Sequence, residues 1–236
     1  MIAVILAGGY GKRLRPITEK IPKNLIDIDG KPIIIRQIEW LKGEGVRRFL
    51  LLTGWLSDKI VSRLGDGGSL GVEIKYSVED EPLGTGGALK NAEDHLRDVD
   101  EFILVNGDII TNLSIYPLLD EATRYRDVIG VLSAVPLQSP YGIIRFNRDG
   151  YISEFIEKPV LEDYWINAGV YVFRREVLDY LPEKGDLERT TLPLLASRGK
   201  LRIVKYMGVF WRSIDSHKDV ELVSEALRTY KSLLGG

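Results

Sequence analysis

Short apolar runs alternate with segments of helical periodicity in the first half of the chain, and this alternation constrains the fold more than any other feature of the sequence. Runs of β-favouring residues are found at residues 2–6, 49–53, 72–76 and 102–105. Segments with apolar residues at helical spacing lie between them, at residues 33–42, 58–64 and 88–96. Strands and helices in this order predict a mostly parallel sheet that is covered by helices.

The second half of the chain is richer in strand patterns than in helix patterns. Strands are predicted at residues 128–135, 143–146, 151–156, 166–173 and 201–206. Helices are predicted at residues 176–180, 187–196 and 219–234. We expect these strands to form a mixed sheet that extends the first one, in an α/β fold. Because no linker rich in Pro, Ser or charge separates the halves, residues 1–236 are expected to form one domain with two lobes.

Composition excludes several classes of protein. With 32 Lys and Arg against 34 Asp and Glu, the formal net charge is −2, so the chain lacks the electrostatic footprint of a nucleic-acid or membrane-surface binder. The absence of cysteine excludes disulfides, thiolate metal sites and cysteine nucleophiles. No apolar run approaches the ~20 residues that span a bilayer, and the N-terminal run is too short for a signal peptide. We therefore expect a cytoplasmic enzyme.

A glycine-rich loop with basic residues follows the first predicted strand, with the sequence Leu6-Ala7-Gly8-Gly9-Tyr10-Gly11-Lys12-Arg13-Leu14-Arg15-Pro16. Glycines at this place let the backbone approach a ligand and direct N–H groups at negative charge, so the loop predicts a phosphate site. It is not a dinucleotide-binding fingerprint, because Leu14 occupies the position of the third glycine and Pro16 follows where the motif would continue into a helix. It is not a Walker A loop either, because Arg13 follows Gly11-Lys12. A glycine-rich turn with solvated cations is the alternative.

The loop belongs to a longer pattern that continues through Thr18, Pro22-Lys23 and Gly30-Lys31-Pro32. Over this pattern the sequence resembles the sugar-1-phosphate nucleotidylyltransferases, which make NDP-sugars from an NTP and a sugar 1-phosphate. The resemblance implies a three-layer, GT-A/Rossmann-like nucleotide-diphospho-sugar transferase fold. It implies one nucleotidyltransferase domain, with a nucleotide-binding lobe at residues 1–112 and a sugar-phosphate lobe at residues 113–236, and no appended acyltransferase or regulatory domain.

In the family the NTP lies on the glycine loop and against a second glycine cluster. The resemblance therefore implies nucleotide contacts from Leu6, Ala7, Gly8, Gly9, Gly11, Glu79, Gly84 and Thr85. It places Arg13 and Lys23 on the phosphates as catalytic cations, because attack on the α-phosphate requires charge neutralisation and a stabilised pyrophosphate. Lys12 and Arg15 could be solvated neighbours.

The second glycine cluster has the sequence Glu79-Asp80-Glu81-Pro82-Leu83-Gly84-Thr85-Gly86-Gly87-Ala88. The family residue at the position of Glu79 hydrogen-bonds the base edge. An ionised carboxylate only accepts hydrogen bonds, and guanine offers two adjacent donors, so Glu79 favours GTP. A solvated carboxylate in a uridylyl-transferring enzyme stays open as an alternative. The glycines could equally form the first turn of the helix near Ala88, where N–H groups still face a ligand.

Asp108 follows the predicted strand at residues 102–105, within Asn106-Gly107-Asp108. The carboxyl end of a parallel strand is where such sheets place their sites, and an Asp there can hold Mg²⁺, as the resemblance also implies. Many relatives carry the second metal ligand in Trp-x-Asp, where this chain has Ser213. We expect Asp215 to take that role instead, with Asp219 as a helix N-cap or first-turn carboxylate.

Three further segments match those that line the sugar-phosphate pocket of the family, namely Tyr141-Gly142, Glu157-Lys158-Pro159 and Asn167-Ala168-Gly169. The implied sugar-phosphate residues are Gly107, Gly142, Glu157, Lys158 and Asn167. Amide and carboxylate groups suit sugar hydroxyls, and Lys158 would be a third catalytic cation, on the phosphate.

Together these features predict Mg²⁺-assisted in-line transfer of a nucleotidyl group from an NTP to a sugar 1-phosphate, with release of pyrophosphate and without a general base. The amino-acid sequence around Glu79 most resembles that of mannose-1-phosphate or heptose-1-phosphate guanylyltransferases, which favours GTP. A glucose-1-phosphate enzyme that uses UTP, dTTP or CTP is one alternative, and a non-catalytic nucleotide-sugar sensor or regulatory subunit is another. The expected partners are the two substrates and further copies of the chain in a homodimer or other homo-oligomer, with no nucleic acid and no membrane.

Overall fold

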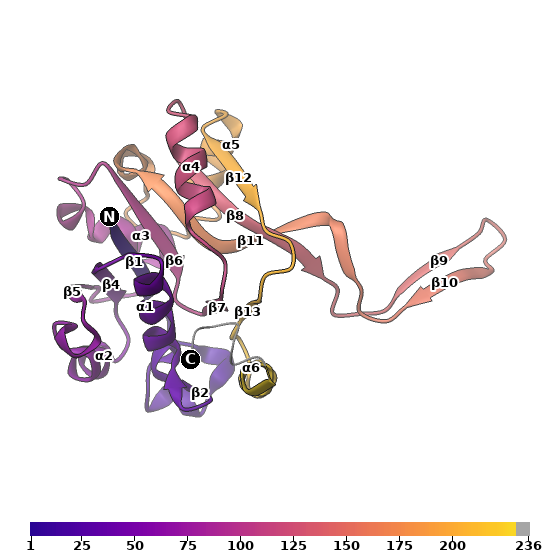
Figure 1. The fold of residues 1–236 in the computed structure, drawn as a ribbon, viewed down its shortest axis with the longest axis horizontal. Coiled ribbons are helices and arrows are strands. Elements are labelled where there is room, and N and C mark those ends of the chain that lie inside the picture. Colours follow the sequence, from indigo (N-terminus) through magenta and orange to yellow (C-terminus); the bar gives the residue numbers. More distant parts are fainter. Residues whose placement is uncertain (230–236) are drawn as a thin grey trace.

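A central sheet of seven strands forms the body of the computed structural model, which describes residues 1–229 (Figure 1). In spatial order the strands are β12 (Leu201–Lys205), β8 (Gly130–Gln138), β11 (Val160–Arg174), β6 (Glu101–Asn106), β1 (Ile2–Ala7), β4 (Arg48–Thr53) and β5 (Glu73–Val78). Only β11 runs antiparallel to its two neighbours, and the other adjacent pairs are parallel. The α/β fold with a mixed, mostly parallel sheet is therefore confirmed.

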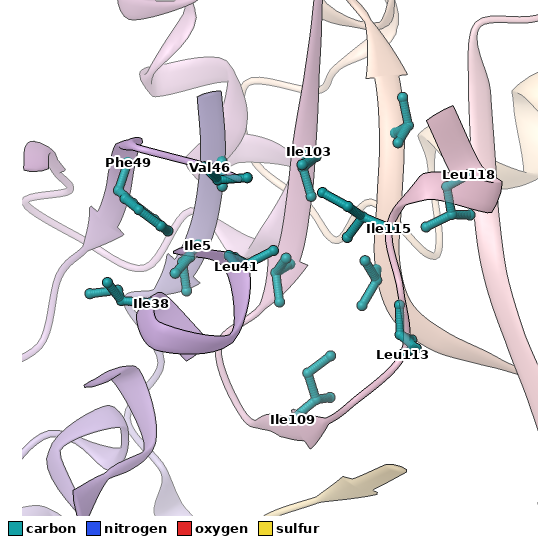
Figure 2. Close-up of a cluster of buried hydrophobic side chains, with 14 of the residues drawn as sticks. Ile5, Ile38, Leu41, Val46, Phe49, Ile103, Ile109, Leu113, Ile115 and Leu118 are labelled. Atoms are coloured by element: carbon teal, nitrogen blue, oxygen red, sulfur yellow. The ribbon is translucent and has the colours of Figure 1, made fainter. Parts of the chain in front are cut away.

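Helices cover both faces of this sheet because its inner strands are apolar on both sides. One face, shown in Figure 2, packs against α1 (Ile33–Gly43), α2 (Ser57–Leu64) and α4 (Tyr116–Arg124). The other face packs against α3 (Gly84–Asn91), the 3₁₀-helix η6 (Arg175–Tyr180) and α5 (Thr191–Ser197). Along β1, Ala3 and Ile5 point to the first layer whereas Ile2 and Val4 point to the second. Burial on both faces explains why the first strand reads as one continuous apolar run.

A third apolar cluster joins the C-terminal helix α6 (His217–Thr229) to the segment after the glycine loop. Val223 and Leu227 of α6 are buried together with Leu14, Ile28 and Ile214. Two short antiparallel pairs that the sequence patterns did not reveal lie nearby: β2 (Asp27–Ile28) with β3 (Lys31–Pro32), and β7 (Ile109–Thr111) with β13 (Trp211–Ser213). These contacts bring the segment that precedes α6 to the carboxyl end of β6.

The expectation that every strand of the second half extends the central sheet is wrong for two of them. β9 (Ile143–Phe146) and β10 (Ile152–Ile156) pair only with each other and form a separate ribbon. Figure 1 shows this ribbon far from the body, at the end of the extended connections from β8 and to β11. We call residues 139–159 the arm.

Several helix boundaries also differ from the predicted ones. The helix predicted at 88–96 begins at Gly84 and ends at Asn91, and the one predicted at 187–196 begins at Thr191. The starts of these two segments contact each other, as described below. The predicted C-terminal helix begins at His217, and its residues 230–234 lie outside the described residues. Among residues 1–229, no helix has both the length and the apolar composition needed to cross a bilayer.

Candidate functional site

A pocket of about 510 Å³ lies at the carboxyl ends of β1 and β6. The predicted residues that line it are Leu6, Gly8, Gly9, Gly11, Arg13, Lys23, Glu79, Gly84, Thr85, Gly107, Asp108 and Asp215. Ala7, Gly142, Glu157, Lys158 and Asn167 are not part of its lining. The structure thus brings the predicted nucleotide and metal residues together from five separate segments of the chain, and it leaves most of the predicted sugar residues outside.

The glycine loop makes a tight turn into a short 3₁₀-helix, η1 (Lys12–Leu14). Gly11 has a φ of +58°, and a Cβ atom there would lie 2.9 Å from Cγ2 of Thr18. The hydroxyl of Thr18 donates a hydrogen bond to the carbonyl oxygen of Gly11 at 2.9 Å. The turn therefore requires glycine for both its backbone conformation and its packing.

Glu79 lies directly over the glycine loop, one residue after the end of β5. A Cβ atom on Gly8 would be 2.5 Å from Oε1 of Glu79, so Gly8 leaves the space that the carboxylate occupies. Burial raises the pKa of Glu79, and a hydrogen bond from the backbone N–H of Leu83 partly opposes that rise. The half-buried carboxylate of Glu79 therefore lies in the wall of the pocket next to Gly8.

The second glycine cluster has a packing reason of its own. The backbone N–H groups of Gly86 and Gly87 donate to the carbonyl oxygen of Gly185 at 2.9 and 3.1 Å. A Cβ atom on Gly84 would lie 2.7 Å from the backbone of Gly185. The hydroxyl of Thr85 donates to Glu188 and accepts from the N–H of Leu187. The glycines thus let the loop before α5 pack against α3, and the nucleotide role of Gly84 and Thr85 stays a prediction.

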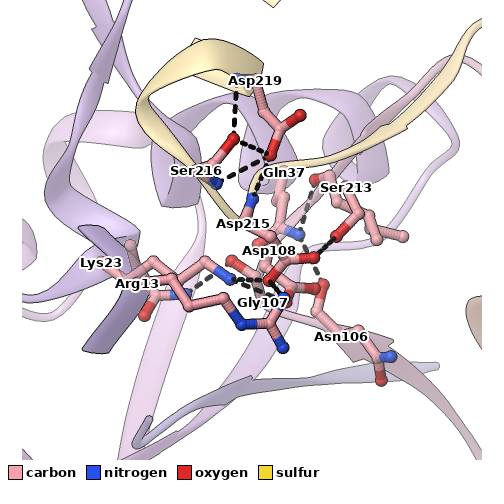
Figure 3. A network of polar contacts seen from close by, with 12 residues as sticks. Arg13, Lys23, Gln37, Asn106, Gly107, Asp108, Ser213, Asp215, Ser216 and Asp219 are labelled. Atoms are coloured by element: carbon pink, nitrogen blue, oxygen red, sulfur yellow. Dashed lines mark hydrogen bonds and ion pairs between the residues drawn. The ribbon is translucent and has the colours of Figure 1, made fainter. Parts of the chain in front are cut away.

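Lys23 joins the two carboxylates that the sequence predicts as metal ligands (Figure 3). Its Nζ atom lies 2.9 Å from Oδ2 of Asp108 and 3.1 Å from Oδ1 of Asp215. Arg13 approaches from solvent, with its Nη1 atom 3.8 Å from Oδ1 of Asp215. Burial raises the pKa of Asp215, but a hydrogen bond from Ser213 and the charges of Lys23 and Arg13 outweigh it, so the pKa lies below its usual value.

These two carboxylates form the candidate metal centre. Both present oxygen atoms within about 3 Å of one point, now taken by the ammonium of Lys23, and such oxygen donors suit Mg²⁺, which takes one or two carboxylates together with phosphate oxygens. Within the described part of the chain there is no group of three or more His, Cys, Asp or Glu residues that could bind a metal alone. The donor set fits a metal that arrives with a phosphate ligand.

The prediction for Asp219 is confirmed. Its Oδ2 atom accepts hydrogen bonds from the backbone N–H groups of Asp215 and Ser216, at 3.0 and 2.7 Å. The hydroxyl of Ser216 in turn accepts a long hydrogen bond from the N–H of Asp219. This reciprocal pair caps the N-terminus of α6 and holds the backbone of Asp215.

Two buried amides, which the motifs did not single out, hold the turn that carries Asp108. The amide nitrogen of Gln37 donates to the carbonyl oxygens of Asn106 and Ile109, at 2.8 and 3.0 Å. Asn24 donates to the carbonyl oxygen of Gly107 at 2.6 Å. The exposed fractions of Gln37 and Asn24 are only 2% and 3%. A polar residue in the otherwise apolar stripe of α1 is the sequence signal that could have identified Gln37.

Replacing Gln37 with methionine is expected to lower the free energy of unfolding by about 2–3 kcal/mol, because it leaves one buried and one partly buried carbonyl group without the amide donor of Gln37. Urea denaturation measures the change. Ile34→Met is the matched control, because it introduces the same side chain at a fully buried site of the same helix and is expected to cost less than about 1.5 kcal/mol. Equal losses in the two variants would show that the amide does not hold the turn.

Asn167 lies beside the pocket. Its amide donates to the hydroxyl of Tyr171 at 2.6 Å and accepts from the N–H of Gly169. A Cβ atom on Gly169 would be 2.8 Å from the amide nitrogen of Asn106, which does line the pocket. The hydroxyl of Tyr171 also hydrogen-bonds the side chain of Asn106, so Tyr171 links Asn167 to a residue of the pocket lining.

Gly142, Glu157 and Lys158 lie together at the root of the arm. A Cβ atom on Gly142 would lie 2.9 Å from Oε2 of Glu157, and the Nζ atom of Lys158 is 3.4 Å from Oε1 of Glu157. Lys158 has a φ of +47°, a conformation that L-residues rarely adopt. The structure therefore brings these three residues to one another. It does not bring Lys158 into the pocket that Arg13 and Lys23, the other two predicted catalytic cations, line.

A family model described as nucleotidyl transferase matches residues 2–227. Among curated proteins, the chain is 36% identical over 229 residues to the mannose-1-phosphate guanylyltransferase catalytic subunit beta of Xenopus tropicalis and 36% identical over 229 residues to the mannose-1-phosphate guanyltransferase of Candida albicans. Each of these alignments covers 93% of this chain and 62% of the relative, so the chain spans about three fifths of the length of the curated relatives it matches.

Solved structures resemble the chain along nearly its whole length. A protein from Bacillus anthracis, named as a glucose-1-phosphate thymidylyltransferase and crystallised with sucrose, has a TM-score of 0.77 at 26% identity, covering 97% of this chain and 96% of its own. HddC from Yersinia pseudotuberculosis, complexed with GMP-PN, has a TM-score of 0.74 at 28% identity, covering 96% of this chain and 99% of its own.

Proposed function

The chain belongs to the nucleotidyl transferase family, which confirms the resemblance seen in its motifs, and from this premise we propose that it transfers a nucleotidyl group from an NTP to a sugar 1-phosphate. The observation that carries the proposal is the convergence of Arg13, Lys23, Asp108 and Asp215 at the glycine loop. The pocket volume of about 510 Å³ is within the range of small-ligand sites.

The chain's own residues supply positioning and charge. The glycine loop directs backbone groups at the NTP, and Arg13 and Lys23 neutralise the phosphates and the departing pyrophosphate. Asp108 and Asp215 would hold Mg²⁺, which when bound adds positive charge at the phosphate oxygens. The buried amides of Gln37 and Asn24 keep the turn of Asp108 in place. No general base is required, because the phosphate nucleophile is already ionised.

GTP with mannose 1-phosphate is the substrate pair that we propose first. Glu79 supports GTP because a carboxylate can accept from both donors of guanine. The names of the two curated relatives and the GMP-PN of the HddC complex agree with this choice. A glucose-1-phosphate enzyme that uses dTTP, UTP or CTP is the second candidate, favoured by the name of the Bacillus anthracis protein.

A pyrophosphate-release assay tests the proposal. Each common NTP is combined with mannose, glucose or heptose 1-phosphate in the presence of Mg²⁺, and turnover is expected with GTP and mannose 1-phosphate. Turnover with another pair of substrates only would contradict the choice of GTP and mannose 1-phosphate and would identify the substrates used. No turnover with any pair would favour a non-catalytic sensor of nucleotide sugars.

The Glu79→Gln variant is expected to lose about tenfold to a hundredfold of its preference for GTP over the other NTPs, because an amide offers one acceptor and one donor where guanine needs two acceptors. The ratio of kcat/KM values measures the preference. Glu81→Gln is the matched control, because Glu81 pairs with Lys184 and does not line the pocket. An unchanged ratio in Glu79→Gln would remove the basis for the base assignment.

The same preference is expected to depend on pH. Because burial raises the pKa of Glu79, the carboxyl takes up a proton at a higher pH than an exposed glutamate does and then loses its acceptor capacity. The wild-type preference for GTP should therefore fall as the pH falls through that raised pKa, and the preference of Glu79→Gln should not change over the same range. Parallel profiles for the two proteins would contradict the role of Glu79.

A further inference from the structure

The glycine loop that lines the pocket has little packing of its own. From Gly8 to Gly11 only Tyr10 carries a side chain, and a Cβ atom on Gly9 would meet no described atom within 4 Å. Glycine loses more backbone freedom on ordering than any other residue, so a loop of this composition needs contacts from outside to keep one conformation. The residues that make these contacts therefore decide how well the loop is prepared for a ligand.

Trp55 contacts the segment that carries the loop at three points. The centroid of its ring lies 5.3 Å from that of Tyr10. Its indole Nε1 atom donates a hydrogen bond to the carbonyl oxygen of Thr18 at 3.0 Å, and its backbone N–H donates to the carbonyl oxygen of Gly8 at 3.5 Å. Since the hydroxyl of Thr18 in turn donates to Gly11, Trp55 is connected to both ends of the loop.

Trp55 itself is held by the start of α2. Lys59 of α2 donates a hydrogen bond to the carbonyl oxygen of Lys20, so the helix is tied to the same segment as the indole. Leu56, directly after Trp55, has a φ of +54°, a conformation that L-residues rarely adopt and that persists only where the surroundings fix it. Trp55 is 40% exposed and belongs to none of the apolar clusters of the described residues, so filling the core does not account for it.

We propose that Trp55 is a positioning residue for the nucleotide, which holds the glycine loop through Tyr10 and Thr18 in the conformation that binds the phosphates. The proposal rests on the function proposed above, because it takes an NTP as the ligand of the loop. A loop that is already ordered binds its ligand without the loss of free energy that ordering on binding requires. Trp55 does not line the pocket, so its effect on the reaction passes through the loop.

Trp55→Leu removes both the aromatic ring and the indole donor. It is expected to raise KM for the NTP that the wild type uses at least about tenfold, because the nucleotide then has to order the loop as it binds. The KM for the sugar 1-phosphate and kcat are each expected to change less than about threefold. Pyrophosphate release with each substrate varied in turn measures these values. A merely structural role would instead lower kcat through the fraction of folded enzyme and leave both KM values unchanged, and that result would overturn the proposal.

Two further variants make this comparison specific. Trp55→Phe is expected to recover most of the affinity for the NTP, because a phenyl ring still packs on Tyr10 although it has no donor for Thr18. Trp165→Leu is the matched control, because it makes the same substitution at a tryptophan that packs against Lys205 and does not line the pocket. It should leave KM for the NTP unchanged. Circular dichroism checks that each variant is folded.

Limited proteolysis gives a second test that needs neither nucleotide nor turnover. Lys12 and Arg13 follow the loop directly, and both are residues after which trypsin cleaves. Mass spectrometry of the free proteins should show this cleavage at least about tenfold faster in Trp55→Leu than in the wild type, and unchanged in Trp165→Leu. Equal cleavage of Trp55→Leu and the wild type would overturn the proposal. A wild type that releases no pyrophosphate would contradict the proposed function instead, and the cleavage rates would still decide whether Trp55 holds the loop.

Discussion

Asp108→Asn is expected to lower kcat/KM for pyrophosphate release by about 10²–10³ under saturating Mg²⁺. The carboxylate of Asp108 is one of the two that converge on Lys23, and removing its charge removes half of the candidate metal centre. The amide keeps the size of the side chain, so the backbone turn that Gln37 and Asn24 hold is expected to persist. The loss should therefore appear in catalysis with little change in stability.

Binding of Mn²⁺ in the presence of nucleotide, measured by electron paramagnetic resonance, gives a second readout that does not require turnover. Asp108→Asn should weaken it, and Asp94→Asn should not. Asp94 is a matched control, because it is an exposed carboxylate that pairs with Arg97 and does not line the pocket. Full activity together with unchanged Mn²⁺ binding in Asp108→Asn would rule out the metal role.

Gly107→Ala is expected to lower the free energy of unfolding by about 3–5 kcal/mol, near the upper end of what one substitution costs. A Cβ atom there would lie 2.0 Å from the carbonyl oxygen of Leu6 and 2.4 Å from the amide nitrogen of Asn24. Neither atom can move easily, because Leu6 belongs to a central strand and the amide of Asn24 holds the turn. Thermal or urea denaturation measures the loss.

Gly9→Ala is the control for this variant. Gly9 is part of the same pocket wall, but a Cβ atom on it would meet nothing within 4 Å, so a change of less than about 0.5 kcal/mol is expected. A Gly107→Ala protein as stable as Gly9→Ala would show that the backbone near Asp108 can shift, contrary to the tight packing described above.

The motifs near the strand ends could be interpreted from the sequence because their chemistry is local. A glycine loop after a strand, or an Asp at the end of an apolar run, indicates where backbone N–H groups and a carboxylate will be. The same patterns could not separate packing from ligand binding at Gly84, Gly86 and Gly87, since that depends on whether a distant backbone approaches. Here the carbonyl oxygen of Gly185, about a hundred residues later in the chain, accepts hydrogen bonds from the N–H groups of Gly86 and Gly87.

The arm shows a second limit of local patterns. The strands at 143–146 and 152–156 have strand-like sequences, and strands are what the structure has there. Periodicity does not say which neighbour a strand pairs with, because pairing depends on how far the connections carry it from the sheet. The exposed Phe and Ile residues of the ribbon belong to strands that the sequence patterns placed in an extended central sheet.

The sequence by itself determined the class of fold, the place of the glycine loop after the first strand and the family, because apolar periodicity and motif spacing are properties of short segments. Only the tertiary structure decided which groups meet. Asp108 and Asp215 lie 85 and 192 residues from Lys23, and they reach its ammonium because β13 pairs with β7 and α6 packs on the segment after the loop. Contacts over such separations are set by the packing of whole elements, and no short pattern encodes them.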